Sequence, residues 1–292
     1  MSAVQNNLKQ YALFIQKLRA FLVDRGVTEV QTKHLVPFEN PDPQVQAIQV
    51  DSQYLHSSPE FAMKRLLTQG SGDIFQLCHV WRQEEEGKWH RDEFIMLEWY
   101  RVGWSLEKLI NEVIELVSEW RIFTVNRISY VDLFKRFLKI DPVNDSCEQM
   151  LRILSLEETC DWSQDILLDY AYSTKIEPTL QGLWVIEDYP ASQAALARLK
   201  PEDSSLALRF EIVINGVEIA NGFDELSCRK TQRLRFINQN KIRRSRGLPE
   251  IPINELWLNS LDHLPACSGV ALGVDRLYAL SHGLPMAGLA TC

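Results

Sequence analysis

Two glutamates in the second half of the chain are spaced so that they could bind one cation. In "RFEIVINGVEIANGFDE", two apolar runs flank Asn215 and Gly216, a dipeptide typical of a two-residue β-hairpin turn. Counting back from that turn places Glu211 opposite Ala220, on the same sheet face as Glu218 and roughly 7–8 Å from it. Two carboxylates at that separation can bind a hard cation such as Mg²⁺, and the alternative is the solvated face of a half-buried hairpin. On the opposite face we expect three buried apolar residues, Phe210, Ile212 and Ile214.

A second stretch gathers charge between two predicted strands, near residues 74–82 and 94–101. In "RQEEEGKWHRDEFIMLEWY", residues 82–100, nineteen positions hold six carboxylates, three basic side chains and a histidine. The donors of an arginine match phosphate or carboxylate oxygens, and the side chain stays charged when it is partly desolvated. Arg82 could therefore bind an anionic group, and the alternative is an exposed strand cation. Most of the loop carboxylates are expected to be solvated.

The elements that must hold these stretches in place are predicted mainly as helices. Residues 6–25 carry apolar side chains at helical spacing. The helix at 57–69 begins with Ser58 and Pro59, which are typical of the first helical positions. Ser105 opens a longer amphipathic helix. The side chains expected to face inward are, in the first helix, Leu8, Ala12, Ile15, Leu18 and Leu22. In the second helix they are Phe61, Leu66 and Leu67, and in the third they are Leu109, Ile110, Val113, Ile114, Val117 and Trp120.

The other segments complete a mixed α/β pattern without repeats. "VTEVQT" predicts a short strand, and residues 129–173 predict several short helices. A basic helix is expected near 228–246, before the final segment "SGVALGVDRLYAL".

Length and composition narrow the class of protein. The chain has 292 residues, 46% of them apolar and 24% charged, which suits one large soluble α/β domain. We expect a cytoplasmic protein, because the sequence has neither a membrane-length apolar run nor a signal pattern. The net charge of −8 argues against broad nucleic-acid binding. The six cysteines form no CxxC pair, and there is no GxxxxGK loop or nucleophile–histidine set.

Four blocks in order resemble the catalytic motifs of class II lysyl-tRNA synthetases: "SSPE", "VWRQEEEGKWHRDEFIMLEWY", "RFEIVINGVEIANGFDE" and "GVALGVDR". With "HLVPFE" and "EFAMKRLL", they are most similar to a shortened branch of that family, the elongation factor P–(R)-β-lysine ligases. The resemblance covers most of the chain and implies an α/β (α+β) class II catalytic fold. That fold has an antiparallel six- to seven-stranded sheet flanked by helices. The resemblance also implies a single catalytic domain over residues 1–292 without the anticodon-binding domain.

The resemblance further implies which side chains bind ATP and Mg²⁺. Arg82 and Arg276 would be the catalytic pair, contacting the α-phosphate and the γ-phosphate. Glu84 would accept a hydrogen bond from the adenine amino group, and Phe94 would stack on the ring. The implied metal ligands are Glu211 and Glu218, and the implied ATP-binding residues are Arg82, Glu84, His90, Arg91, Phe94, Glu218, Ile219, Gly273 and Arg276.

An acidic pocket for a diamino acid is also implied. A buried ammonium is costly unless carboxylates surround it. Glu60 would bind the amino group near the substrate carboxylate, and Glu225 would bind the distal ammonium. Ala271 stands where lysyl-tRNA synthetases generally have glycine, and its methyl group would favour (R)-β-lysine over α-lysine. The implied substrate-binding residues are Ser58, Pro59, Glu60, Glu98, Tyr100, Asn221, Phe223, Glu225 and Ala271.

The implied reaction is ATP-dependent activation of (R)-β-lysine or lysine as an aminoacyl-adenylate. The substrate carboxylate attacks the α-phosphorus and pyrophosphate leaves, so catalysis rests on positioning and charge neutralisation. The acceptor would be a lysine side chain of elongation factor P. The basic helix at 228–246 could dock that partner or could simply be solvated. The family implies a homodimer, and neither tRNA nor a membrane is expected as a partner.

Two departures from the family pattern keep other functions open. "EVQTKHLVPFE" runs on without the family's proline and loop, in a region that contributes to the dimer interface, and the segment after Arg276 is short. The alternatives are a stand-alone lysyl-tRNA synthetase-like enzyme, a free amino acid ligase and a non-catalytic paralogue.

Overall fold

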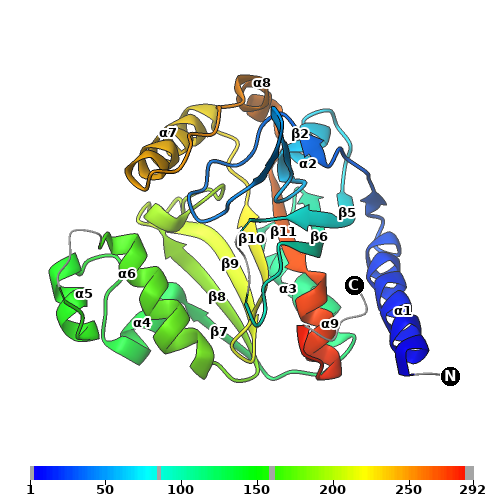
Figure 1. Cartoon of the computed structure of the whole chain (residues 1–292), viewed down its shortest axis with the longest axis horizontal. Helices are drawn as coiled ribbons and strands as arrows, with labels where there is room; N and C mark the ends of the chain where they lie inside the picture. The colour runs from blue at the N-terminus through cyan, green and yellow to red at the C-terminus, as the bar shows by residue number, and fades with distance from the viewer. Residues whose placement is uncertain (1–2, 84–86, 158–161, 287–292) are drawn as a thin grey trace. The chain divides into compact units, whose positions relative to one another are not determined.

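The chain folds into two compact units, which Figure 1 shows in a computed structural model. The first unit comprises Met1–Arg121 and Glu225–Cys292, and the second comprises Ile122–Asp224. Among the described residues, no helix combines the length and apolar content that a membrane span requires. The structure describes residues 3–83, 87–157 and 162–286.

The strands of the first unit are β1 (Thr28–Glu29), β2 (Leu35–Val36), β3 (Ile48–Val50), β4 (Gln53–Leu55), β5 (Ile74–Trp81), β6 (Glu93–Val102) and β11 (Cys267–Gly273). Strands β1, β5, β6 and β11 lie side by side in that order. β6 pairs antiparallel with both β5 and β11, whereas β1 is parallel to β5. A small separate sheet has the order β2-β4-β3. The two strands predicted around the charged loop, β5 and β6, are confirmed.

One face of this sheet is covered by α3 (Leu106–Ser118), the helix predicted to open at Ser105. The Ser105 side chain accepts a hydrogen bond from the Lys108 N–H and so caps the helix. Glu112 of α3 accepts hydrogen bonds from Trp99 Nε1 at 3.0 Å and from Arg101 Nε at 2.9 Å. The face of β6 that bears Trp99 and Arg101 therefore packs against α3 in the core. The opposite face carries the predicted binding residues.

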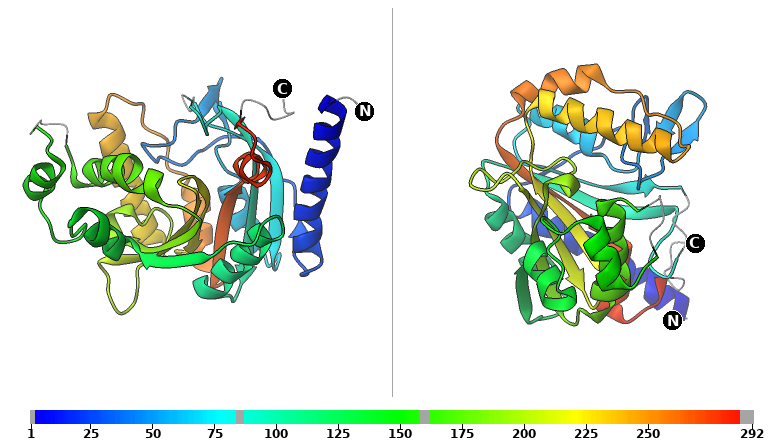
Figure 2. Two further views of the ribbon diagram at one scale, coloured as in Figure 1. Left: turned by 90° about the horizontal axis from the view of Figure 1, so that it is seen from below. Right: turned by 90° about the vertical axis from the view of Figure 1, so that its left-hand side faces the viewer.

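Helix α1 (Ala3–Val23) confirms the first predicted helix, and its predicted inward residues Leu18 and Leu22 are fully buried, but the buried face is rotated from the predicted one. Leu8 is 48% exposed and Ala12 is also exposed, whereas Phe14 and Phe21 are buried. The Phe14 ring contacts Trp120 and Tyr278, so aromatic packing sets the rotation of the helix. Figure 2 shows α1 running along one side of the first unit.

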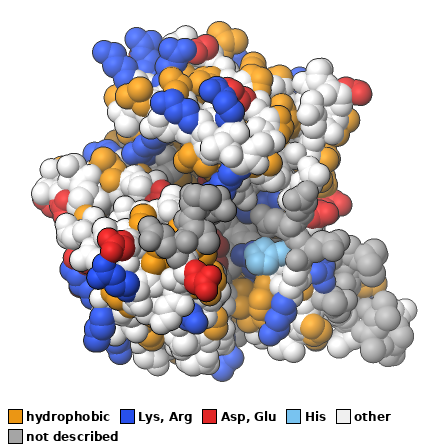
Figure 3. Space-filling model, turned by 60° about the vertical axis from the view of Figure 1, so that its left-hand side comes forward, with side chains coloured by type: hydrophobic (Ala, Val, Ile, Leu, Met, Phe, Trp, Pro, Cys, Tyr) orange, Lys and Arg blue, Asp and Glu red, His pale blue; other side chains and the backbone are white. Residues whose placement is uncertain are grey.

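The other helices of the first unit are α2 (Glu60–Leu67), α7 (Arg229–Ser245), α8 (Glu255–Ser260) and α9 (Val274–His282). In α2 the fully buried residues are Met63, Lys64 and Leu67, whereas the predicted Phe61 and Leu66 are only half-buried. Lys and Arg side chains gather where α7 lies, as Figure 3 shows at the top of the view. Several of them form ion pairs, including Arg233 with Glu255 and Arg244 with Glu250.

The strands of the second unit are β7 (Val125–Ser129), β8 (Leu183–Pro190), β9 (Leu206–Ile214) and β10 (Glu218–Asp224). They lie in the order β10-β9-β8-β7; β8–β9 and β9–β10 are antiparallel, and β7–β8 is parallel. The hairpin of β9 and β10 was predicted, whereas β7 and β8 were not. Across the two units, these two sheet segments contain eight strands in the described part of the chain, or seven without the two-residue β1.

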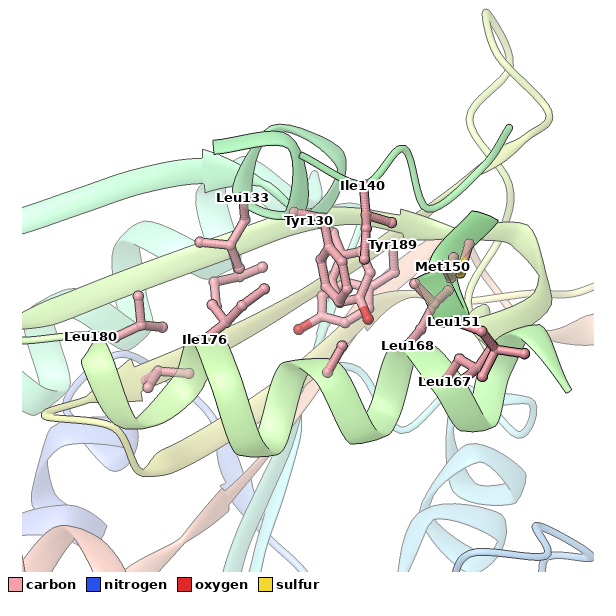
Figure 4. Packing of buried hydrophobic residues seen from close by; sticks show 14 residues of the cluster. Tyr130, Leu133, Ile140, Met150, Leu151, Leu167, Leu168, Ile176, Leu180 and Tyr189 are labelled. Carbon is pink, nitrogen blue, oxygen red and sulfur yellow. The ribbon is translucent and has the colours of Figure 1, made fainter. Parts of the chain in front are cut away.

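Residues 129–173 form several short helices, as predicted, and these helices cover one face of the second unit's sheet. They are α4 (Tyr130–Leu138), α5 (Cys147–Leu154), α6 (Gln164–Ala171) and a π-helical turn, Tyr172–Ile176. Their apolar side chains pack against Tyr189 of β8 and Val213 of β9 in one buried cluster, which Figure 4 shows. Because Val213 and Glu211 are two positions apart on β9, this helical layer covers the sheet face that also bears Glu211.

Candidate functional site

The face of the first unit's sheet opposite α3 is built to bring polar groups close to the backbone. Gly269 of β11 pairs with Tyr100 of β6, and Ala271 pairs with Glu98. A Cβ atom at Gly269 would lie only 2.3 Å from Tyr100 Cε1 and 2.6 Å from Glu225 Oε1. Only glycine therefore fits at residue 269, a requirement that the sequence analysis missed.

Two buried carboxylates, Glu98 and Glu225, and the half-buried Glu60 converge on this face around one ammonium group. Lys64 Nζ lies 2.6 Å from Glu60 Oε1 and 2.6 Å from Glu225 Oε2. The third carboxylate, Glu98, accepts hydrogen bonds from the Ser58 hydroxyl at 2.6 Å and the Tyr100 hydroxyl at 2.6 Å. The residues Ser58, Glu60, Lys64, Glu98, Tyr100 and Glu225 are called the acidic cluster below.

Several pKa values in the acidic cluster are strongly shifted, and burial raises those of its two buried carboxylates. Burial together with the charge of Glu60 raises the pKa of Glu98 to about 7. Burial also raises the pKa of Glu225 to about 8, although the Lys64 ammonium opposes the shift. The two ion pairs outweigh burial at Lys64 and raise its pKa, so Lys64 stays charged. An ammonium group brought next to Glu98 and Glu225 would relieve the cost of their ionisation.

Lys64 was not predicted as a site residue, because a lysine in an amphipathic helix normally faces water. Its side chain is only 1% exposed. One local signal was present: Glu60 and Lys64 are spaced i,i+4, which suits an ion pair on one helix face. Pro59 precedes the helix, and the Ser58 hydroxyl accepts the Glu60 N–H at 3.0 Å, which sets the start of α2.

The two arginines predicted to bind ATP belong to elements that meet in the first unit. Arg276 of α9 donates from Nε to the Trp89 carbonyl at 3.0 Å, in the loop that follows Arg82. Asp275 fixes this end of α9, because its carboxylate accepts the Ile95 N–H and the Tyr11 hydroxyl, each at 2.8 Å. The start of α9 at Gly273 is thereby held against β6. The structure thus brings Arg276 to the loop that Arg82 opens.

The Arg82 guanidinium carbon lies 5.3 Å from the centroid of the ring of Phe94, near the start of β6. The Arg82 N–H donates to the Asp92 carbonyl at 2.8 Å, which continues the β5–β6 pairing. Arg91 donates to the His90 carbonyl at 2.8 Å, so its side chain folds back onto its own loop. Glu84 lies outside the described residues. The roles of these residues in ATP binding remain predictions.

The hairpin of the second unit places its acids on one face, but in a different register from the predicted one. Glu218 lies opposite Val213 as expected, but a β-bulge at Ile219 shifts the pairing, and Asn221 rather than Ala220 lies opposite Glu211. The bulge moves Asn221 and Phe223 onto the face of Glu211 and Glu218. Glu211 is only 6% exposed, so this is not a solvated face. The predicted inward residues Phe210, Ile212 and Ile214 are also buried.

The oxygen donors of this hairpin face fit a hard divalent cation. Burial and the nearby charge of Glu218 raise the pKa of Glu211 to about 7, and a cation would offset both effects. Asn221 Nδ2 approaches Glu211 Oε1 at 3.4 Å, whereas Asn221 Oδ1 has no hydrogen-bond partner among the described residues. Arg209 already occupies one Glu211 oxygen at 2.6 Å. In the part of the chain that the structure describes, no group of three or more His, Cys, Asp or Glu side chains is arranged to hold a metal ion.

Comparison with known proteins shows which family the chain belongs to. The family described as "tRNA synthetases class II (D, K and N)" matches residues 1–286. A Proteus mirabilis (strain HI4320) protein named elongation factor P–(R)-β-lysine ligase is 42% identical, with 97% of this chain and 93% of that protein covered. A protein of the same name from Klebsiella pneumoniae (strain 342) is 40% identical, with 98% and 94% covered. The predicted resemblance is confirmed, and the chain belongs to the class II tRNA synthetase family.

Proposed function

We propose that this protein is an ATP-dependent, AMP-forming ligase that activates (R)-β-lysine or lysine and transfers it to a lysine side chain of elongation factor P. The acidic cluster is the observation that carries the proposal. Three carboxylates, two of them buried, have a single ammonium group among them, so the cluster favours further positive charge, which a diamino acid supplies. An amino acid without a second ammonium group would leave Glu98 without an ion-pair partner and Glu225 with Lys64 alone.

The two arginines would bind the ATP phosphates, because guanidinium donors match phosphate oxygens and keep their charge. Phe94, beside Arg82, would offer its ring to the adenine. The substrate carboxylate, placed by the acidic cluster, would then attack the α-phosphorus in line with the departing pyrophosphate. Mg²⁺ bound by Glu211 and Glu218 would supply further neutralisation of phosphate charge. No side chain needs to act as a nucleophile.

Elongation factor P is proposed as acceptor because the relatives named above are named for its modification. The basic face of α7 is a weaker indication, since ion pairs with Glu250, Glu255 and Asp262 offset part of its charge. A cytoplasmic homodimer is part of the same proposal. Its oligomeric state can be measured by light scattering.

The direct test offers both acceptors at once. Purified protein is incubated with ATP, Mg²⁺ and (R)-β-lysine in the presence of elongation factor P and total tRNA. We expect mass spectrometry to find one β-lysyl group on a lysine of elongation factor P, and no charged tRNA. Efficient charging of tRNA without labelling of the protein would refute the proposed acceptor. A control reaction without ATP should leave both acceptors unmodified.

A further inference from the structure

Lys64 occupies the middle of the acidic cluster, although no substrate role is assigned to it by the family resemblance. Its ammonium bridges Glu60 and Glu225 at 2.6 Å each, and its side chain is 1% exposed. Glu60 is a residue of α2, whereas Glu225 follows β10, so Lys64 ties together two segments that are distant in sequence. These are also the two carboxylates expected to bind the two amino groups of the substrate.

The formal charges of the acidic cluster match a substrate with two ammonium groups. Glu60, Glu98 and Glu225 contribute three negative charges and Lys64 contributes one positive charge, so the cluster lacks two positive charges. Lysine and (R)-β-lysine each bring two ammonium groups. In the empty cluster, protons on Glu98 and Glu225 partly make up the deficit.

We infer that Lys64 is a positioning and specificity-determining residue, which holds Glu60 and Glu225 at a fixed separation and sets the charge of the pocket to match a diamino acid. This inference rests on the proposed function of the same pocket. Without the Lys64 ammonium, Glu60 and Glu225 would lose the cation that holds them together. Glu225 would then hold its proton more tightly, because the Lys64 charge that lowers its pKa is gone, and it would pair less readily with a substrate ammonium group.

The test compares Lys64→Met, which keeps the length of the side chain and removes its charge, with Arg65→Met, which removes an exposed cation from the same helix. Amino acid binding is measured by calorimetry, and activation is measured by pyrophosphate–ATP exchange. For Lys64→Met we expect the Kd and KM for the diamino acid to rise at least roughly a hundredfold, with the KM for ATP within about twofold of wild type. Arg65→Met should behave as wild type.

A pH profile separates a charge-matching role from a merely structural one. Because Lys64 lowers the pKa of Glu225, its loss should move the acidic limb of diamino acid binding to higher pH by about one to three pH units. Lys64→Arg keeps the charge and should restore the position of that limb, even if its affinity is lower. A structural defect would lower affinity at every pH without moving the limb.

Several results would show that Lys64 does not have this role. An unchanged KM for the diamino acid, an unmoved acidic limb, or an equal loss towards ATP and amino acid would overturn it. If circular dichroism shows that Lys64→Met does not fold, Lys64→Gln replaces it, and failure of both variants to fold would make Lys64 a folding residue and also overturn the inference. If instead the wild-type protein neither binds nor activates any diamino acid, the proposed function itself fails.

Discussion

At the scale of single residues, the acidic cluster keeps carboxylates in a place where their ionisation is costly. Glu98 and Glu225 have pKa values raised to about 7 and about 8 by burial. A carboxylate must be ionised to pair with an ammonium, so the binding of a diamino acid must displace these protons. The folded state binds the protons of these two carboxylates more tightly than the unfolded state does. The free energy of unfolding of the substrate-free protein should therefore fall as the pH rises from about 4.5 through about 8.

We predict that affinity for lysine rises at least roughly tenfold between pH 6 and pH 8, with release of protons on binding. Calorimetry in buffers of different ionisation enthalpy measures both quantities. Glu225→Gln should remove much of the proton release as well as the pH dependence. A flat affinity across this range, or proton uptake on binding, would contradict the role given to these carboxylates.

Arg276 offers a second prediction at the residue scale. Arg276→Ala should lower pyrophosphate–ATP exchange by roughly a thousandfold, because a cation aimed at developing phosphate charge is lost. Its side chain is only half-buried, so the unfolding midpoint should change little. Arg136→Ala, which removes an exposed arginine of α4, is the matched control. Exchange within threefold of wild type would remove Arg276 from the proposed phosphate site.

Sequence reasoning at this scale found the residues that local motifs mark, and missed those defined by packing. Glu60, Glu98 and Glu225 lie together in the structure, as the predicted diamino acid pocket requires. Lys64 and Gly269 were missed for the same physical reason. Burial of a lysine depends on Glu225, which lies far along the chain, and the need for glycine at 269 depends on the Tyr100 ring across the sheet.

At the scale of elements, the turn of the β9–β10 hairpin shows what local sequence can determine. Asn215 and Gly216 both adopt positive φ angles, 51° and 74°, as the predicted two-residue turn requires. The predicted register holds as far as Glu218 and is wrong beyond it, because the bulge at Ile219 adds a residue to β10. Strong local signals also predicted β5, β6 and the Ser105 cap. The rotation of α1 was not predictable, because Phe14 contacts aromatic rings from α9 and from the segment after α3.

Gly216 gives the prediction at this scale. A Cβ atom there would lie 2.8 Å from the Glu177 carbonyl oxygen, in addition to the strain of a positive φ angle. Gly182 has a similar φ angle of 80°, but its Cβ would lie 3.7 Å from the nearest atom. Gly182→Ala should cost about 1–2 kcal/mol of unfolding free energy, and Gly216→Ala clearly more. Urea unfolding followed by circular dichroism measures both, and equal losses would show that the Glu177 contact is unimportant.

At the scale of the whole molecule, the two units carry different parts of the proposed chemistry. The first contains the acidic cluster together with Arg82 and Arg276, and the second contains the proposed metal ligands Glu211 and Glu218. We predict that Glu218→Gln weakens Mg²⁺-dependent ATP use by roughly tenfold or more and leaves diamino acid binding in the absence of ATP within about twofold. Titrating Mg²⁺ in the exchange assay checks this, and unchanged magnesium dependence would exclude Glu218 as a ligand.

The central claim is that a charge-matched pocket selects an amino acid with two ammonium groups for activation. Pyrophosphate–ATP exchange with lysine and (R)-β-lysine, compared with norleucine, tests it most directly, because norleucine keeps the side-chain length and lacks the distal ammonium. We predict that kcat/KM for the better diamino acid exceeds that for norleucine by at least roughly a thousandfold, since norleucine brings only one of the two ammonium groups that the acidic cluster requires. Comparable exchange with norleucine would contradict the claim.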